Sequence, residues 1–244
     1  MTRNVKQDFQ NLEQFVRQYR IADPADNPAY RNLLSRQHKV YHAILTLLAE
    51  LDHQSWFPIT QTDPRAANVN GLFRERLLEF ASDLGSALFS WLHGTYKGAR
   101  LLLRSSIENF IKTIGLLDFD RILTMRNTYE VFDLAKTGSF FSIPVNIPRF
   151  QCLQDAYSTL SRDVHTATSA EMQHVAALNF FPCFGEDDAH RFASLFTRVA
   201  SVFLEALVVL CENVYHAMHH GNRDVINGVL SHAVRATLNQ SERP

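Results

Sequence analysis

The chain has 244 residues, of which 46% are hydrophobic and 20% are charged, and its formal net charge at pH 7 is −1. A chain of this length can bury a substantial core, and its near-neutral charge excludes a general electrostatic attraction to nucleic acid. The 18 phenylalanines, which carry no polar atom, predict that this core is large and dry.

The cysteines and the apolar runs indicate in which cellular compartment the protein is expected and whether it enters a membrane. Cys152, Cys183 and Cys211 are odd in number and far apart, which excludes a disulfide framework and suits a reducing cytosol. The polar start MTRNVKQDFQ predicts no signal peptide. The most apolar run, SVFLEALVVLC, is interrupted by Glu205 and is about half the ~20 residues that a bilayer requires. We therefore expect a soluble, cytoplasmic protein without membrane contact.

Apolar residues recur at helical spacing through the first part of the chain. The first expected helix has one apolar face, made by Phe9, Leu12, Phe15, Val16 and Tyr19. ADPADNPAY then breaks this helix with two prolines and offers Asp or Asn caps, so a second helix is expected from about Pro28 to His53. Residues 56–71 read as a loop that is punctuated by Pro58, Pro64 and Gly71.

Helical spacing continues through the rest of the chain. Helices are expected at 72–93, 99–117 and 119–138, and Gly138 is a typical stop. SFFSIPVNIP reads as a loop before a helix at about 149–165. Negative charge at 186–188 favours the start of the longest helix. The tail NRDVINGVLSHAVRATL is amphipathic and can pack on the domain or on a partner.

The sequence therefore predicts an all-α fold, a helical bundle with extra N-terminal and C-terminal helices. No stretch alternates apolar and polar residues as a half-buried strand does, and no G-x-G-x-x-G or P-loop pattern occurs. We expect three parts: an N-terminal helical extension (1–70), a helical core (71–218) and a C-terminal amphipathic tail (219–244).

Arg104 lies at the margin of the main apolar face of the helix ARLLLRSSIENFIKTIGLL, and Glu108 follows one turn later. A cation on a helix that is apolar almost all round is costly unless it has a partner. One interpretation is a half-buried Arg104–Glu108 ion pair that fixes helix packing. However, Arg before Glu is the weaker orientation for such a pair, so a different group is a candidate partner for Arg104.

The segment YSTLSRDVHT places Tyr157, Ser161 and His165 on one helical stripe, with Arg162 one turn before His165. These residues can be an ordinary polar surface with a histidine at a helix end. They can also cleave RNA without a metal, because the ribose 2′-hydroxyl supplies the nucleophile. Histidine then transfers protons near neutral pH, and arginine binds the phosphate. Ser161 or Tyr157 can add a hydrogen bond.

Together, these two segments resemble the HEPN superfamily, in particular its branches with an R-x-x-x-E helix and an LS-x-x-x-H helix. The resemblance covers about residues 75–215. It implies a bundle of four or five helices, often dimeric. Many members are ribonucleases of toxin–antitoxin, CRISPR and anti-phage systems, and others are inactive binding partners. The catalytic signature of the family is R-x(4–6)-H, usually with a polar residue after the arginine.

The resemblance assigns Arg104 and Glu108 to the first motif and Ser161 and His165 to the second. Arg162, Asp163 and His165 match the residue types of the catalytic signature, but only two residues separate Arg162 from His165. Two alternatives follow from this spacing. Either Arg104 supplies the cation while His165 keeps its role, or the domain is an inactive interaction module that acts as an adaptor, sensor or inhibitor.

Other chemistries have weaker support. His216 and His220 in YHAMHHG have the i, i+4 spacing of metal ligands, but a histidine pair lacks the ligand count of a closed zinc site. We expect no metal and no cofactor. The expected partners are RNA, a second copy of the chain in a homodimer, and a protein that docks on the C-terminal helix.

Overall fold

The computed structural model describes residues 3–18, 25–165 and 182–241. The molecule is 79% helical and has no strand among these residues, which confirms the predicted all-α helical bundle. The elements in chain order are α1 (Arg3–Gln18), α3 (Pro28–His53), α4 (Ala66–Leu92), α5 (Tyr96–Gly115), the short 3-10 helix η1 (Asp120–Thr124), α6 (Thr128–Lys136), α7 (Ile147–His165), α8 (Glu186–Leu210), α9 (Glu212–Ala217), α10 (His220–Asn227) and α11 (His232–Ser241).

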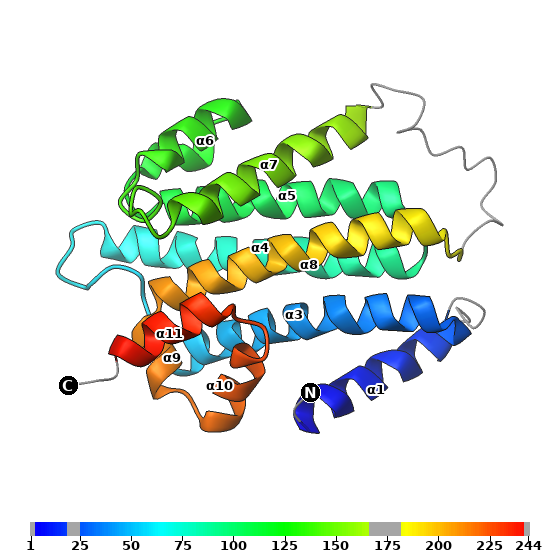
Figure 1. Ribbon diagram of the computed structural model, residues 1–244. Coiled ribbons are helices and arrows are strands. Elements are labelled where there is room, and N and C mark those ends of the chain that lie inside the picture. The colour runs from blue at the N-terminus through cyan, green and yellow to red at the C-terminus, as the bar shows by residue number, and fades with distance from the viewer. Residues whose placement is uncertain (1–2, 19–24, 166–181, 242–244) are drawn as a thin grey trace.

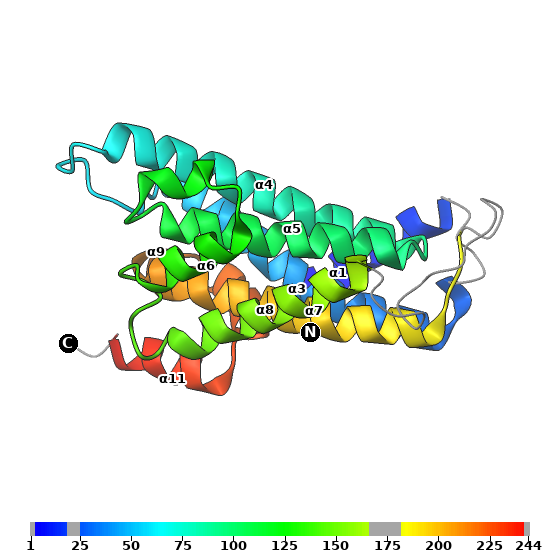
Figure 2. The same cartoon turned by 90° about the horizontal axis from the view of Figure 1, so that it is seen from above.

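The long helices α3, α4, α5 and α8 lie alongside one another, and the shorter helices cover their two sides (Figure 1). α6 and α7 lie on one side, where α6 packs against α5 and α7 packs against both α5 and α8. Figure 2 shows α7 running along the α5–α8 side. α1 and α10 pack on α3 at the other side. The two segments that carry the motifs, α5 and α7, are therefore neighbours in space.

A cluster of phenylalanine rings joins three of the long helices. Phe80 of α4, Phe110 of α5 and Phe203 of α8 are fully buried, and their ring centroids lie 4.5–5.3 Å apart. Tilted and edge-on rings at this separation attract one another beyond the burial of their area. The continuous core extends from Val5 to Leu238, so residues of all three predicted parts contribute to it.

Local chemistry explains where several helices begin. α3 begins at Pro28 as expected, and the side chain of Asn27 accepts hydrogen bonds from the backbone N–H groups of residues 29 and 30. The expected loop at 56–71 was wrong at its end, because α4 begins at Ala66 and Gly71 lies inside it. The expected helix at 119–138 is divided into η1 and α6, with Asn127 as the cap of α6.

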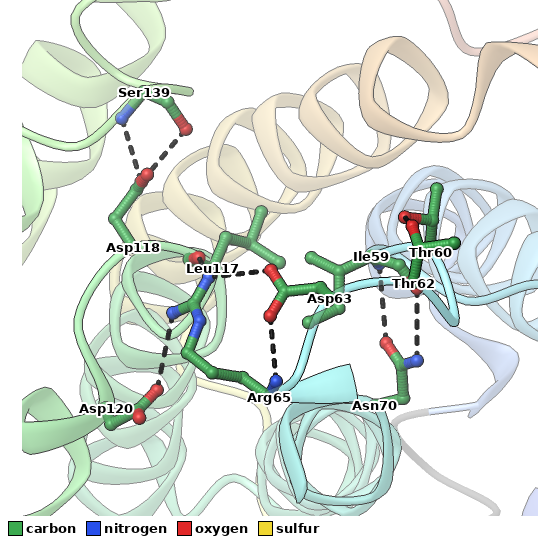
Figure 3. A network of polar contacts seen from close by, with 10 residues as sticks. All are labelled: Ile59, Thr60, Thr62, Asp63, Arg65, Asn70, Leu117, Asp118, Asp120 and Ser139. Carbon is green, nitrogen blue, oxygen red and sulfur yellow. Dashed lines mark hydrogen bonds and ion pairs between the residues drawn. The ribbon is translucent and has the colours of Figure 1, made fainter. Parts of the chain in front are cut away.

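A polar network fixes the turn that follows α5 (Figure 3). The guanidinium of Arg65, in the loop before α4, donates to the backbone oxygen of Leu117 at 3.1 Å and lies 3.5 Å from the carboxylate of Asp120. Asp118 accepts from the backbone N–H and the hydroxyl of Ser139, just after α6. Since these contacts hold both ends of the η1–α6 segment, they fix how α6 lies on α5.

The C-terminal segment packs on its own chain. Val225, Val234 and Leu238 are at most 4% exposed and belong to the continuous core. The better apolar face of this segment is therefore occupied within the molecule.

Among the described helices, α8 alone is long and apolar enough to cross a membrane by length and composition. Half of its most apolar window is buried against the rest of the chain. Phe192, Phe196 and Phe203 of α8 are among the largest fully buried side chains, so its apolar character is that of a central core helix.

Candidate functional site

The guanidinium of Arg104 joins the two motif helices. Its Nε donates a hydrogen bond to Oγ of Ser161 at 3.0 Å, and its Nη2 donates to the hydroxyl of Tyr157 at 2.6 Å. Its central carbon lies 4.8 Å from the centroid of the Tyr157 ring, which is close enough for a cation–π contact. One arginine thus joins α5 to α7, and of the two interpretations that the sequence left open for Arg104, the partner is a group other than Glu108.

Helical spacing explains this placement. Leu103 and Ile107 of α5 are fully buried, so Arg104 lies at the margin of the buried face, half-exposed and beside α7. On α7, Ala156 and Leu160 are fully buried and Tyr157 is 7% exposed. The hydroxyl of Tyr157 therefore needs a hydrogen-bond partner from within the protein, and Arg104 provides it.

Glu108 contacts a different neighbour. Its carboxylate accepts from Nζ of Lys112 at 2.8 Å and from the hydroxyl of Thr128 at 3.3 Å. No ion pair joins Arg104 and Glu108, although both side chains are in the described part of the chain. Thr128 is the first residue of α6, so one turn of α5 holds α7 through Arg104 and α6 through Glu108.

A pocket of about 450 Å³ opens between α6 and α7. Tyr129 and Phe132 of α6 and Tyr157 of α7 form its aromatic wall. The polar wall comes from α7 and consists of Gln154, Asp155, Ser158, Ser161 and Arg162. Tyr157 and Ser161, the two groups that bind Arg104, are therefore part of the pocket surface.

The other predicted residues lie near the end of α7. Arg162 is exposed and lines the pocket beside Ser161. The side chains of Asp163 and His165 lie outside the described residues, while the backbone of α7 is helical through position 165. Position 165 therefore follows Ser161 by about one turn, in agreement with the stripe expected from the sequence.

The sequence reasoning missed the pocket residues Tyr129, Phe132, Gln154, Asp155 and Ser158. A signal for the α7 residues was present, because positions 154, 155, 158, 161, 162 and 165 form one continuous polar stripe at helical spacing. No comparable signal marked Tyr129, since its place at the pocket depends on how α6 folds back onto α5.

The histidines near the C-terminus have local roles. Nδ1 of His219 accepts from the backbone N–H of Gly221 at the start of α10, and Nε2 of His216 lies 3.3 Å from the carboxylate of Glu212. In the parts of the chain that the structure describes, no three His, Cys, Asp or Glu side chains are placed to hold a metal ion.

Comparison with known proteins identifies no relative of this chain. The chain matches no protein-family model, and searches of curated proteins and of solved structures also return no match. The resemblance to HEPN proteins therefore depends on the motif residues of α5 and α7.

Proposed function

We propose that this protein is a HEPN-like, metal-independent ribonuclease with its active site at the α5–α7 contact. The observation that carries the proposal is the position of Arg104, which binds Tyr157 and Ser161 at the surface of a pocket that Arg162 also lines. A guanidinium has five N–H donors, and two of them serve these bonds. The other three make no hydrogen bond to a described residue, so they are available for phosphate oxygens.

The chemistry follows from these residue types. His165 takes the proton from the ribose 2′-hydroxyl, and the resulting oxygen attacks the adjacent phosphorus. The bond from phosphorus to the 5′-oxygen breaks, and that oxygen takes a proton from water while His165 returns its proton to the solvent, which gives a 2′,3′-cyclic phosphate and a 5′-hydroxyl. Arg104 and Arg162 stabilise the negative charge that develops on the phosphate. Tyr157 and Ser161 orient Arg104.

The proposal includes a homodimer, a cytoplasmic location and a role in an anti-phage defence or toxin–antitoxin module. A dimer would bring a second Arg162 and a second His165 to the site, which offsets the short spacing between these residues in one copy. The three cysteines are free thiols in the structure, as a reducing compartment requires.

The test is to incubate the purified protein with tRNA and with total RNA in the presence of EDTA. His165→Ala should abolish cleavage, and His232→Ala, which replaces an exposed histidine on α11, should cleave like the parent protein. The expected products carry cyclic phosphate ends. Equal decay with the parent protein and with His165→Ala, or no decay with either, would remove the ribonuclease proposal.

A second candidate function, a binding module without catalysis, is favoured by an apolar pocket between α3 and α4. This pocket measures about 300 Å³ and is walled by side chains that include Leu45, Phe57 and Leu78. These three are 38%, 45% and 61% exposed, and an exposed apolar cluster of this kind marks an interaction site. At the pocket, Arg74 and Asp52 pair with each other, so the surface offers no net charge.

A groove between two helices with a neutral rim suits the apolar face of an amphipathic helix from a partner protein. Leu78→Glu should abolish retention of such a partner, because it places a charge in the pocket. Leu101→Glu, which changes a leucine of α5 that is 42% exposed and lies outside the pocket, is the matched control. A partner that is identified and retained equally by both variants would exclude this groove as its docking site.

A further inference from the structure

We propose that the pocket between α6 and α7 receives one unpaired base of an RNA strand, stacked on the ring of Tyr129. This inference rests on the proposed function and adds a substrate class to it: a single-stranded segment that places a base beside the reacting phosphate. The pocket volume of about 450 Å³ is in the range of sites that bind small organic groups, and its wall is partly aromatic.

Tyr129 is the most exposed of the large apolar and aromatic side chains in the described residues, at 79%. Its ring makes no aromatic contact with a described residue, in contrast to Phe132 and Tyr157, whose ring centroids lie 5.2 Å apart. A base stacked on Tyr129 would cover this exposed face. Stacking on an aromatic side chain is the usual way in which proteins hold unpaired bases.

The backbone beneath this ring is fixed from two directions. The side chain of Asn127 accepts from the backbone N–H of Tyr129 at 3.1 Å and donates to Glu130 at 2.9 Å. The hydroxyl of Thr128 donates to Glu108 on α5. Because the backbone of this turn is already fixed and a tyrosine has only two side-chain torsions, stacking on this ring has to order few bonds.

The polar wall of α7 provides groups for the edge of a base. The amide of Gln154 makes no hydrogen bond to a described residue, and it can donate and accept. Asp155 accepts from Gln151 through Oδ1 at 2.9 Å, while no described group donates to its Oδ2. A carboxylate accepts from an exocyclic amino group, which adenine, cytosine and guanine carry and uracil lacks. The pocket should therefore disfavour uracil.

Charge along α7 sets the direction of the nucleotide. Asp155 lies at one end of the pocket wall and Arg162 at the other, seven residues or about 10 Å apart along the helix axis. Asp155 repels phosphate. Arg162 attracts it, and so does Arg104, whose guanidinium lies beside this end of the wall because it is hydrogen-bonded to Ser161. The base therefore lies toward Asp155, and its phosphate lies toward Arg162 and position 165.

The experiment measures fluorescence anisotropy of labelled single-stranded A12, C12 and U12 RNA, with His165→Ala as the parent so that no strand is cut. Tyr129→Ala should weaken binding of A12 and C12 roughly 5- to 100-fold, as expected for the loss of one stacked base. Tyr129→Phe, which keeps the ring, should bind within about twofold of the parent. Asp155→Asn should reduce the preference for A12 over U12.

Two results would overturn the inference. The first is equal affinity of the Tyr129→Ala and parent proteins for all three strands, and the second is no binding of any strand. Cleavage assays separate this inference from the ribonuclease proposal. If Tyr129→Ala in the active protein cuts RNA with the parent's rate and base preference, the pocket assignment fails and the nuclease stands. If no protein cuts RNA but binding depends on the Tyr129 ring, the nuclease fails and the pocket assignment stands.

Discussion

The contact between Arg104 and Tyr157 can be tested by a double-mutant cycle on stability. Tyr157→Phe removes one hydrogen bond to a charged group and keeps the ring, which should cost about 1.5 kcal/mol. Arg104→Met removes that bond, the bond to Ser161 and the cation–π contact, which should cost about 3 kcal/mol in total. The double variant should be about as stable as Arg104→Met, because the tyrosine hydroxyl then has no partner left to lose.

The coupling energy between the two sites is therefore expected to be about 1.5 kcal/mol, from urea unfolding at pH 7.5. For a chain of this size, the single variants should melt about 3–6 °C and 6–12 °C below the parent protein. Ser158→Ala, an exposed change on the same helix, serves as the control and should lie within about 0.5 kcal/mol of the parent. Additive costs, with a coupling energy below about 0.3 kcal/mol, would refute the contact and with it the facing of α5 and α7.

Three further predictions concern the fold. Asn27→Ala removes the cap of α3 and should cost about 1 kcal/mol in urea unfolding. Gly94→Ala should lower the melting temperature by at least about 4 °C, because Gly94 has φ +76° and a Cβ would lie 2.3 Å from the backbone oxygen of Cys183. Gly98→Ala, whose Cβ would meet no atom closer than 3.8 Å, should leave it unchanged or raise it, and equal melting of the two variants would contradict this reasoning. Burial lowers the pKa of His38 below its ordinary value, and its buried Nδ1 has no partner in the described structure. The folded state therefore favours the neutral imidazole, so the free energy of unfolding is highest above about pH 6.5 and falls as the pH drops below that value. His38→Gln should reduce this fall, which urea unfolding at a series of pH values would measure.

The sequence predicted some helices closely because their ends carry local chemistry. α3 begins at Pro28 after the cap Asn27, and α8 begins at Glu186 where three acidic residues meet the helix N-terminus. These effects act over one turn and can be read from a few adjacent letters. Long apolar stripes at steps of three and four then fix the helical state between such ends.

Other boundaries depended on contacts that are distant in the sequence. α4 begins at Ala66, before Gly71, because Ala66 and Val69 are buried in the core and tertiary packing outweighs the low helix propensity of glycine. The 119–138 segment has an apolar pattern typical of one helix. It divides before α6 because Asn127 caps a new helix there and Thr128 bonds to Glu108, twenty residues earlier.

The candidate site was predictable in part, because one of its residues carries a signal that can be read within a single helix. A cation on an apolar helix implies a partner, and the weaker orientation of an Arg–Glu pair made a group other than Glu108 a candidate partner for Arg104. The spacing of residues on α5 could not show which groups bind Arg104, because Tyr157 and Ser161 follow it by 53 and 57 residues in the sequence. The resemblance to HEPN proteins supplied the second helix, and it supplied no information about Tyr129.

The spacing of Arg104 and Glu108 has a structural consequence that is independent of catalysis. Because the two residues are one turn apart, they lie on nearly the same side of α5, where Arg104 holds α7 and Glu108 holds α6. This clamp builds the pocket whether or not RNA is cut, so it is equally useful to an inactive binding module. A loss of activity in Arg104→Met would therefore have two causes that the assay does not separate: a disturbed pocket and a missing contact to the phosphate. None of the hydrogen bonds that make this clamp involves His165, so His165→Ala removes none of them, and for this reason the histidine variant is the decisive one for catalysis.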